Sequence, residues 1–448
     1  MIYTARAATA AAVAALLLTT LAAPAAAAAD PSPITVTASS HTIDFGSAIR
    51  FSLDATSSAA SIMEIQARFK PIGPKTVWSY TYARFTPAAT VHARFEIRTR
   101  DGTYYPPGVQ FDVYSLITDA AGNSLQTPTE RIHYLDPDLQ WQHTTKGAVT
   151  ALTYDVSPST IQALLDAAAE RLPVIMETTG VQSPGEYTAV LFASPAEAEA
   201  HFPPVSETTR REHTFAGFAT PQYALFILAR PRPDMFVHEL THLVVAQATT
   251  SPLATPVPAW LNEGLAVFFE TGSSNTSRQS IQKAAQRGEL LPLHTMNSIP
   301  GRPADIYTFY PQAGAFVGYL IERFGSTAIA DIFRRLDSGQ PVAAAVEAAI
   351  GVPLDSLDAH FRTRMGAPAT PAPAPTPTPA PAPTAQTPER TAETAALTPA
   401  PAPTAAAEPG GSASAARDVN DTLLYLAIAA GAGLLIGGAV AHLRGRRR

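Results

Sequence analysis

The Ala/Pro/Thr-rich stretch from residue 367 to residue 418 limits most strongly what this chain of 448 residues can fold into. It holds thirteen of the 41 prolines, many of them alternating with Ala or Thr. Such a segment cannot bury enough apolar surface to offset the entropy lost on ordering. We expect a disordered, extended tether, which at about 3.1 Å per residue reaches at most on the order of 150 Å. The folded structure is therefore expected before it, in residues 31–366.

The N-terminus has the pattern of a secretory signal peptide. Arg6 is the only charge before Asp30, and an apolar run is followed by small residues that suit a signal-peptidase site. We assign residues 1–29 to this signal. The alternative is an uncleaved membrane anchor, although the alanine-rich run is only weakly hydrophobic.

A second apolar segment lies near the C-terminus. Leu423–Ala441 is 19 residues long and has no charge, which is enough to span the hydrocarbon of a bilayer as a helix. We place a transmembrane helix at 421–442, followed by a basic tail at 443–448 that predicts a cytoplasmic C-terminus. The expected protein is a single-pass protein of the cell membrane whose large N-terminal region lies outside the cytoplasm.

Composition excludes several classes of site and partner. The chain has no cysteine, so it has no disulfide framework, no thiol nucleophile and no Cys-ligated metal. Its net charge of −6 gives no support for nucleic-acid binding. The metal ligands available to it are therefore His, Asp and Glu, and the sequence does not indicate an oligomeric state.

Residues 31–136 have the alternation of half-buried strands. Apolar and polar residues alternate in Ile34–Thr37, Ile49–Leu53, Val91–Ile97 and Phe111–Ile117, with Pro- and Gly-rich turns between such segments. About seven short strands in this length predict an antiparallel β-sandwich. It resembles the immunoglobulin-like or fibronectin type III-like modules of exported bacterial proteins, which implies binding or spacing and no chemistry.

Residues 138–366 change character and predict an α+β domain. The expected strands are 149–156, 187–193 and the strongly apolar 223–229. The last of these is either an edge strand at the rim of a cleft or a buried core strand. The expected helices are 157–172, 195–202, 234–248, 258–270, 276–287, 309–324, 326–337, 341–350 and 353–364.

The segment Phe236–Val244 contains the motif His-Glu-x-x-His. Positions i and i+4 share one face of a helix, so His238 and His242 can offer nitrogens to one ion. Glu239 is then offset, within reach of a metal-bound water without ligating the metal. The alternative is an ordinary solvent-exposed helical face that carries two unrelated histidines.

A second segment, Pro258–Glu270, contains Glu263, which lies 21 positions after His242. A helix beginning near Pro258 would present Glu263 towards the first helix. Two imidazoles and one carboxylate leave a fourth tetrahedral position for water, the arrangement of a catalytic Zn²⁺. Glu263 is otherwise explained as an ordinary first-turn glutamate favoured by the helix dipole.

HELTH followed by WLNEGLAVFFE resembles the gluzincin metallopeptidases, of the M1 aminopeptidase type and of the shorter bacterial peptidase MA-like domains. The resemblance implies a zincin-like fold, zinc held by His238, His242 and Glu263, and Glu239 as general base. It also implies a tyrosine on a downstream helix that stabilises the oxyanion; Tyr310 is the candidate and Tyr307 the reserve.

The sequence also departs from that family pattern. The G-x-M-E-N segment that captures a free substrate amine in M1 enzymes is missing, and Gly217–Pro221 stands in its region. This favours an endopeptidase over an aminopeptidase. The aspartate found four residues after the glutamate ligand in thermolysin-like enzymes is replaced by Val267. Glu270 is a candidate to orient a histidine in its place, or it is a surface charge.

Together these features predict a membrane-anchored, extracytoplasmic zinc metallopeptidase that hydrolyses protein or peptide substrates. The alternative is a cell-surface binding or adhesion protein whose metallopeptidase domain is structural or degenerate. The presence of Glu239 argues against a purely structural zinc site, which needs no base.

Overall fold

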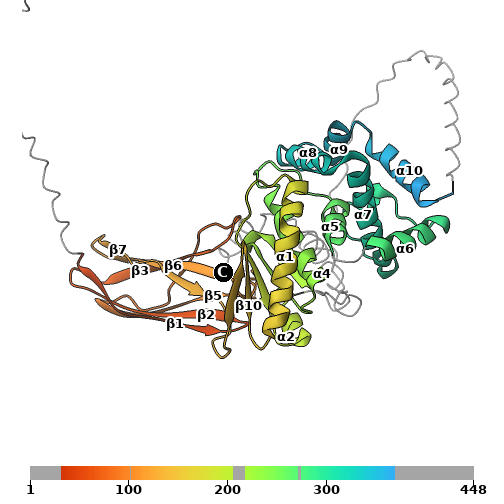
Figure 1. Ribbon diagram of the computed structural model, residues 1–448. Coiled ribbons are helices and arrows are strands. Elements are labelled where there is room, and N and C mark those ends of the chain that lie inside the picture. The colour runs from red at the N-terminus through yellow and green to blue at the C-terminus, as the bar shows by residue number, and fades with distance from the viewer. Residues whose placement is uncertain (1–31, 101, 205–216, 271–273, 369–448) are drawn as a thin grey trace, which may run out of the picture.

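The computed structural model describes residues 32–100, 102–204, 217–270 and 274–368. The expected signal peptide, nearly all of the tether, the transmembrane helix and the basic tail lie outside these residues. Within the described part of the chain, no helix combines the length and apolarity needed to cross a membrane. The described residues form a sheet-rich N-terminal region followed by a largely helical one (Figure 1).

The N-terminal region consists of two antiparallel sheets. One contains β1 (Ile34–Asp44), β2 (Ala48–Ser57) and β5 (Thr90–Arg98). The other contains β3 (Ile62–Pro71), β4 (Ser79–Tyr82), β6 (Gln110–Asp119), β7 (Ser124–Gln126) and β8 (Glu130–His133). Alternate residues such as Leu53, Ile65 and Ile117 meet in a buried cluster that both sheets share. The period-two pattern in the sequence therefore packs one sheet on the other, as expected for half-buried strands.

A third sheet begins the second region, with strand order β12-β13-β11-β10-β9. Its strands are β9 (Gln142–Lys146), β10 (Val149–Thr153), β11 (Tyr187–Leu191), β12 (Gly217–Thr220) and β13 (Leu225–Leu228). The central strands β10, β11 and β13 are parallel, while β9 and β12 are antiparallel edges. The apolar segment 223–229 is thus an interior strand, and the edge-strand interpretation was wrong. A continuous apolar run is the pattern of a strand buried on both faces.

The first helix of this region, α1 (Pro158–Thr179), follows β10. Ser157 caps it by accepting a hydrogen bond from the Thr160 N–H, and Gly180 ends it in a left-handed conformation. The helix continues seven residues beyond the expected end at Leu172, through Pro173. Buried residues beyond the proline, such as Ile175, keep the last turns packed against the domain core.

The other helices follow their expected positions closely. They are α2 (Pro195–Ala200), α4 (Pro233–Gln247), α5 (Ala259–Phe269), α6 (Ser274–Gln286), α7 (Pro303–Phe324), α8 (Ser326–Asp337), α9 (Val342–Ile350) and α10 (Leu354–Met365). Short 3₁₀ turns occur at η1 (Pro221–Tyr223) and η2 (Leu293–Thr295). Only α7 begins much earlier than expected, because Pro303 provides a favourable first helical position and Pro311 is accommodated inside the helix.

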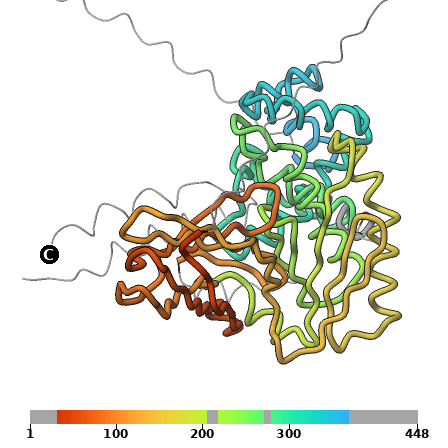
Figure 2. Tube along the Cα trace, turned by 90° about the vertical axis from the view of Figure 1, so that its left-hand side faces the viewer, coloured from red at the N-terminus to blue at the C-terminus, as the bar shows by residue number. Residues whose placement is uncertain are grey.

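The two faces of the third sheet are covered by different parts of the chain. Ala151, Ala189 and Phe226 face α1, α4 and the following helices. Their neighbours Leu152, Val190 and Ile227 face the N-terminal sheets and share a buried cluster with residues such as Phe111. Figures 1 and 2 both show the red-orange N-terminal sheets against the yellow-green strands, with the green-blue helices beyond. The N-terminal region therefore completes the core of the second region.

Polar contacts and close approaches reinforce this junction. The Tyr104 hydroxyl donates to the carbonyl of His201 at 2.6 Å, and the Lys75 ammonium donates to the carbonyl of Thr249 at 2.9 Å. Gly73 lies so close to η1 that a Cβ there would be 2.2 Å from the carbonyl oxygen of Gln222. The loop between β3 and β4 is thus fixed against the helical region.

Candidate metal centre

Helix α4 carries the two histidines. Pro233 occupies its first turn, and no later residue of the helix is a proline, so the i to i+4 geometry is undistorted. His238 and His242 lie one above the other, with ring centroids 4.9 Å apart. Phe236 and Val237 in the same helix are fully buried in the domain core. The core therefore fixes the direction in which the imidazoles point.

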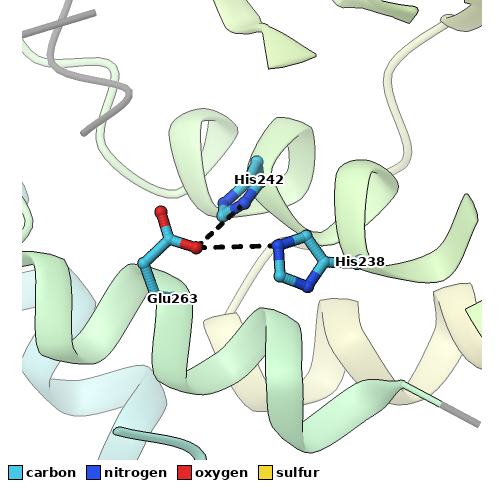
Figure 3. Close-up of side chains that lie close together, drawn as sticks. All are labelled: His238, His242 and Glu263. Carbon is cyan, nitrogen blue, oxygen red and sulfur yellow. Dashed lines mark ion pairs between the residues drawn. The ribbon is translucent and has the colours of Figure 1, made fainter. Parts of the chain in front are cut away.

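Helix α5 supplies the carboxylate. Its first two N–H groups, of Ala259 and Trp260, donate to the carbonyls of Asn297 and Met296, which fixes the start of the helix. Glu263 is only 3% exposed, and its Oε2 lies 3.6 Å from His238 Nε2 and 3.4 Å from His242 Nε2. Figure 3 shows this carboxylate pointing between the two rings from the facing helix.

These distances fit a tetrahedral zinc site. Two ligand atoms that each lie about 2.1 Å from a tetrahedral ion are about 3.4 Å apart. The ligand atoms of His238, His242 and Glu263 all lie within 4.8 Å of one another. Two imidazole nitrogens and one carboxylate oxygen are donors that zinc accepts, with a fourth position left for water. The residues therefore fit the ion that the sequence motif implies.

Charge in the cluster also favours a cation. Burial opposes the charged form of His238, but the carboxylates of Glu263 and Glu270 beside it outweigh burial and raise the pKa of His238 to about 10. Burial likewise opposes the carboxylate of Glu263, but His242 and His238 outweigh it and lower its pKa to about 2. The buried carboxylates thus stabilise positive charge at this position, which is where a divalent cation would lie.

Each histidine has a hydrogen-bond acceptor at its other ring nitrogen. Glu270 Oε1 lies 2.7 Å from His238 Nδ1, and Asn262 Oδ1 lies 3.0 Å from His242 Nδ1. Both contacts favour a proton on Nδ1 and leave Nε2 for a metal. The sequence left two interpretations of Glu270, a group that orients a histidine or a surface charge. The structure places it beside His238. Asn262 was missed, although its position directly before Glu263 was the available signal.

Glu239 lies beside the ligand cluster and is not part of it. Its carboxylate is 5% exposed and accepts a hydrogen bond from the backbone N–H of Ala219 in β12. Burial raises its pKa, and the neighbouring His238 and His242 oppose that shift. A buried carboxylate with a raised pKa next to a metal site has the properties of a general base.

The candidate tyrosines differ in position. Tyr310 is partly buried and close enough to Glu263 and Glu239 that burial and these two charges raise its pKa well above the usual value. Tyr307 is 81% exposed, which favours Tyr310 over it as the candidate. Val267, at the position of the thermolysin-type aspartate, packs against Gly314 of α7 instead.

Comparison with known proteins finds one family match and several similar solved structures. Residues 232–367 match the family described as the Peptidase MA superfamily. A solved M1 zinc metallopeptidase from Deinococcus radiodurans is similar over 77% of this chain and 97% of its own, with 12% identity and a TM-score of 0.36. An aminopeptidase N family protein from Idiomarina loihiensis is similar over 73% and 71%, with 11% identity and a TM-score of 0.27. None of the curated proteins matches the chain. The match to the family supports a gluzincin-type peptidase domain in residues 232–367.

Proposed function

We propose that this gluzincin-type domain is an active zinc metallopeptidase that hydrolyses peptide bonds. The observation that carries the proposal is the buried cluster of His238, His242 and Glu263 with ligand spacing suited to zinc. Glu239 beside it provides a base that a structural site does not need. The four residues come from two helices whose positions are fixed by the domain core.

The side chains divide the chemistry between them. When bound, zinc polarises the scissile carbonyl and lowers the pKa of a coordinated water. Glu239 would take a proton from the attacking water and deliver it to the leaving amine. Glu270 and Asn262 hold the imidazoles in the tautomer that leaves Nε2 for the metal. Tyr310, whose raised pKa keeps its hydroxyl protonated, is the proposed donor to the oxyanion.

The finer specificity is proposed from the sequence. We propose endopeptidase rather than aminopeptidase activity, since Gly217–Thr220 of β12 contains no acidic side chain to bind a substrate amine. We further propose that the domain lies outside the cytoplasm and is anchored by the C-terminal apolar segment. The support for this location is the apolar and basic pattern of the two chain ends.

One observation favours the alternative of a surface-binding protein. Trp78, Tyr80 and Tyr82, which follow one another at every second position around β4, are 47%, 58% and 52% exposed. Exposed aromatic side chains in a group often mark an interaction surface. Such a surface is compatible with an active peptidase, so the two functions are distinguished by activity rather than by structure.

The decisive experiment compares wild type with Glu239→Gln. Both proteins should bind one equivalent of zinc, because Glu239 is not a ligand. Wild type should cleave a peptide library, and the variant should be slower by about 10²–10⁴-fold, the usual contribution of a general base. Mass spectrometry of the products reports endo- or exo-cleavage. Stoichiometric zinc without cleavage of any peptide pool by wild type would reject the proposal and favour the binding protein.

A further inference from the structure

The edge strand β12 contacts the general base directly. It is the last strand in the sheet order, pairs with β13 on one side and packs against α4. We propose that Gly217 and Ala219 of this strand are positioning residues that fix the carboxylate of Glu239. The inference rests on the proposed function for its catalytic consequence, but its geometry rests on the contacts of Gly217 and Ala219 with Glu239.

Gly217 provides the space that Glu239 occupies. A Cβ at position 217 would lie 2.6 Å from Oε1, 2.7 Å from Cγ and 2.8 Å from Cδ of Glu239. The backbone of Gly217 is not left-handed, so an alanine would adopt its conformation without strain. The glycine is therefore required by the close approach of the glutamate and not by the shape of the strand.

Ala219 provides the hydrogen bond. Its backbone N–H donates to the Glu239 carboxylate from the same strand, two residues along from the Gly217 contact. Gly217 and Ala219 therefore act on Glu239 from the same edge. One contact limits how far the carboxylate can move towards the strand, and the other holds it there.

A methyl group at position 217 would move the base and leave the ligands in place. The atoms it would meet belong to the end of a flexible side chain, so Glu239 moves more easily than the strand. None of the three nearest atoms belongs to His238, His242 or Glu263. A displacement of about 1 Å at a catalytic group can cost on the order of 10²-fold in rate.

The first test is Gly217→Ala in the full chain. We expect kcat to fall by about 10²-fold with KM unchanged, because the base is displaced and the ligands are not. Zinc content and the visible absorption of the Co²⁺-substituted protein should equal those of wild type. Gly301→Ala is the matched control, since no atom lies within 4 Å of a Cβ there and the backbone is not left-handed.

Two double variants separate positioning from a general structural effect. In the Glu239→Gln background, Gly217→Ala should not lower kcat further, because no base remains to be displaced. In the Glu239→Ala background, the crowding disappears. The decrease in Tm caused by Gly217→Ala in wild type, roughly 2–4 °C, should therefore vanish.

Each outcome decides the inference. Wild-type turnover in Gly217→Ala would overturn the inference while the proposed function stands. Loss of zinc from Gly217→Ala would also overturn it. So would a Tm decrease caused by Gly217→Ala that is as large in the Glu239→Ala background as in wild type. If wild type cleaves no peptide, the proposed function fails. The Tm cycle then still decides whether Gly217 sets the position of Glu239, since that measurement needs no turnover.

Discussion

At the scale of single residues, Glu270 shows how a site can depend on a group that the motif does not contain. It follows α5 directly and lies seven positions after Glu263. Its carboxylate is 19% exposed and contacts His238 Nδ1 at 2.7 Å. The acceptor for the second histidine, Asn262, is a neutral amide. His238 thus has the stronger, charged partner.

We predict that Glu270→Ala weakens zinc binding by about 10–100-fold, because His238 loses the acceptor that fixes its tautomer. Glu270→Gln, which keeps an acceptor without the charge, should fall between this variant and wild type. Competition with a chromophoric chelator measures the affinity. The exposed Glu347 of α9 gives the matched control, Glu347→Ala. Equal zinc affinity in Glu270→Ala and wild type would show that the contact does not orient the histidine.

Only some of the site residues could be predicted from the sequence. The His-Glu-x-x-His spacing and Glu263 depend on local helix geometry, so the sequence could bring the three side chains together. Asn262, Ala219 and Gly217 act through contacts between elements, and no local pattern marks them. Tyr307 and Tyr310 are three positions apart, yet only the packing of α7 distinguishes the exposed residue from the partly buried one.

At the scale of elements, the position of Glu263 depends on how closely α5 approaches α7. Gly264 lies at their contact, where a Cβ would be 2.6 Å from Val317 Cγ2 and 2.7 Å from the carbonyl oxygen of Ala313. Gly314 of α7 faces Val267 of α5 in the same way. Glycines on both helices thus allow the helix that carries the carboxylate to approach its neighbour.

We predict that Gly264→Ala destabilises the protein by about 1–3 kcal/mol or more, because backbone and packed side chains must move. Gly318 on α7 is the matched control, because a Cβ there would make ordinary contact, 3.4 Å from the Phe268 ring. Gly318→Ala should be neutral or stabilise by up to about 1 kcal/mol through helix propensity. Denaturant unfolding measures both. A Gly264→Ala variant as stable as Gly318→Ala would contradict the close approach of the helices.

At the scale of the whole molecule, the N-terminal sheets and the peptidase region share a hydrophobic core. Leu152, Val190 and Ile227 of the third sheet are at most 2% exposed, and they pack against the N-terminal sheets. Gly108 lies in a loop of the N-terminal region that approaches the third sheet closely. A Cβ added at Gly108 would be 2.7 Å from Val190 Cγ2. The N-terminal region is thus part of the support of the sheet that carries β12.

We predict that a chain lacking residues 32–136 does not form a stable peptidase region, because one face of its sheet would be exposed to water. The expected result is aggregation or loss of the near-ultraviolet circular dichroism signal, and loss of zinc binding. Limited proteolysis against the full chain provides an independent measurement. A soluble, protease-resistant, zinc-binding product would instead show that the N-terminal sheets are an independent spacer.

The sequence by itself determined the features that depend on local spacing. The i to i+4 histidines, the helices α4 and α5 and the alternation of the N-terminal strands follow from helix and strand periods, which neighbouring residues set. The tertiary structure alone decided which strand is the edge beside Glu239, which acceptors hold the histidines, and that the N-terminal sheets complete the peptidase core. Those features arise from contacts between residues distant in the chain, and a local pattern does not specify which surfaces meet.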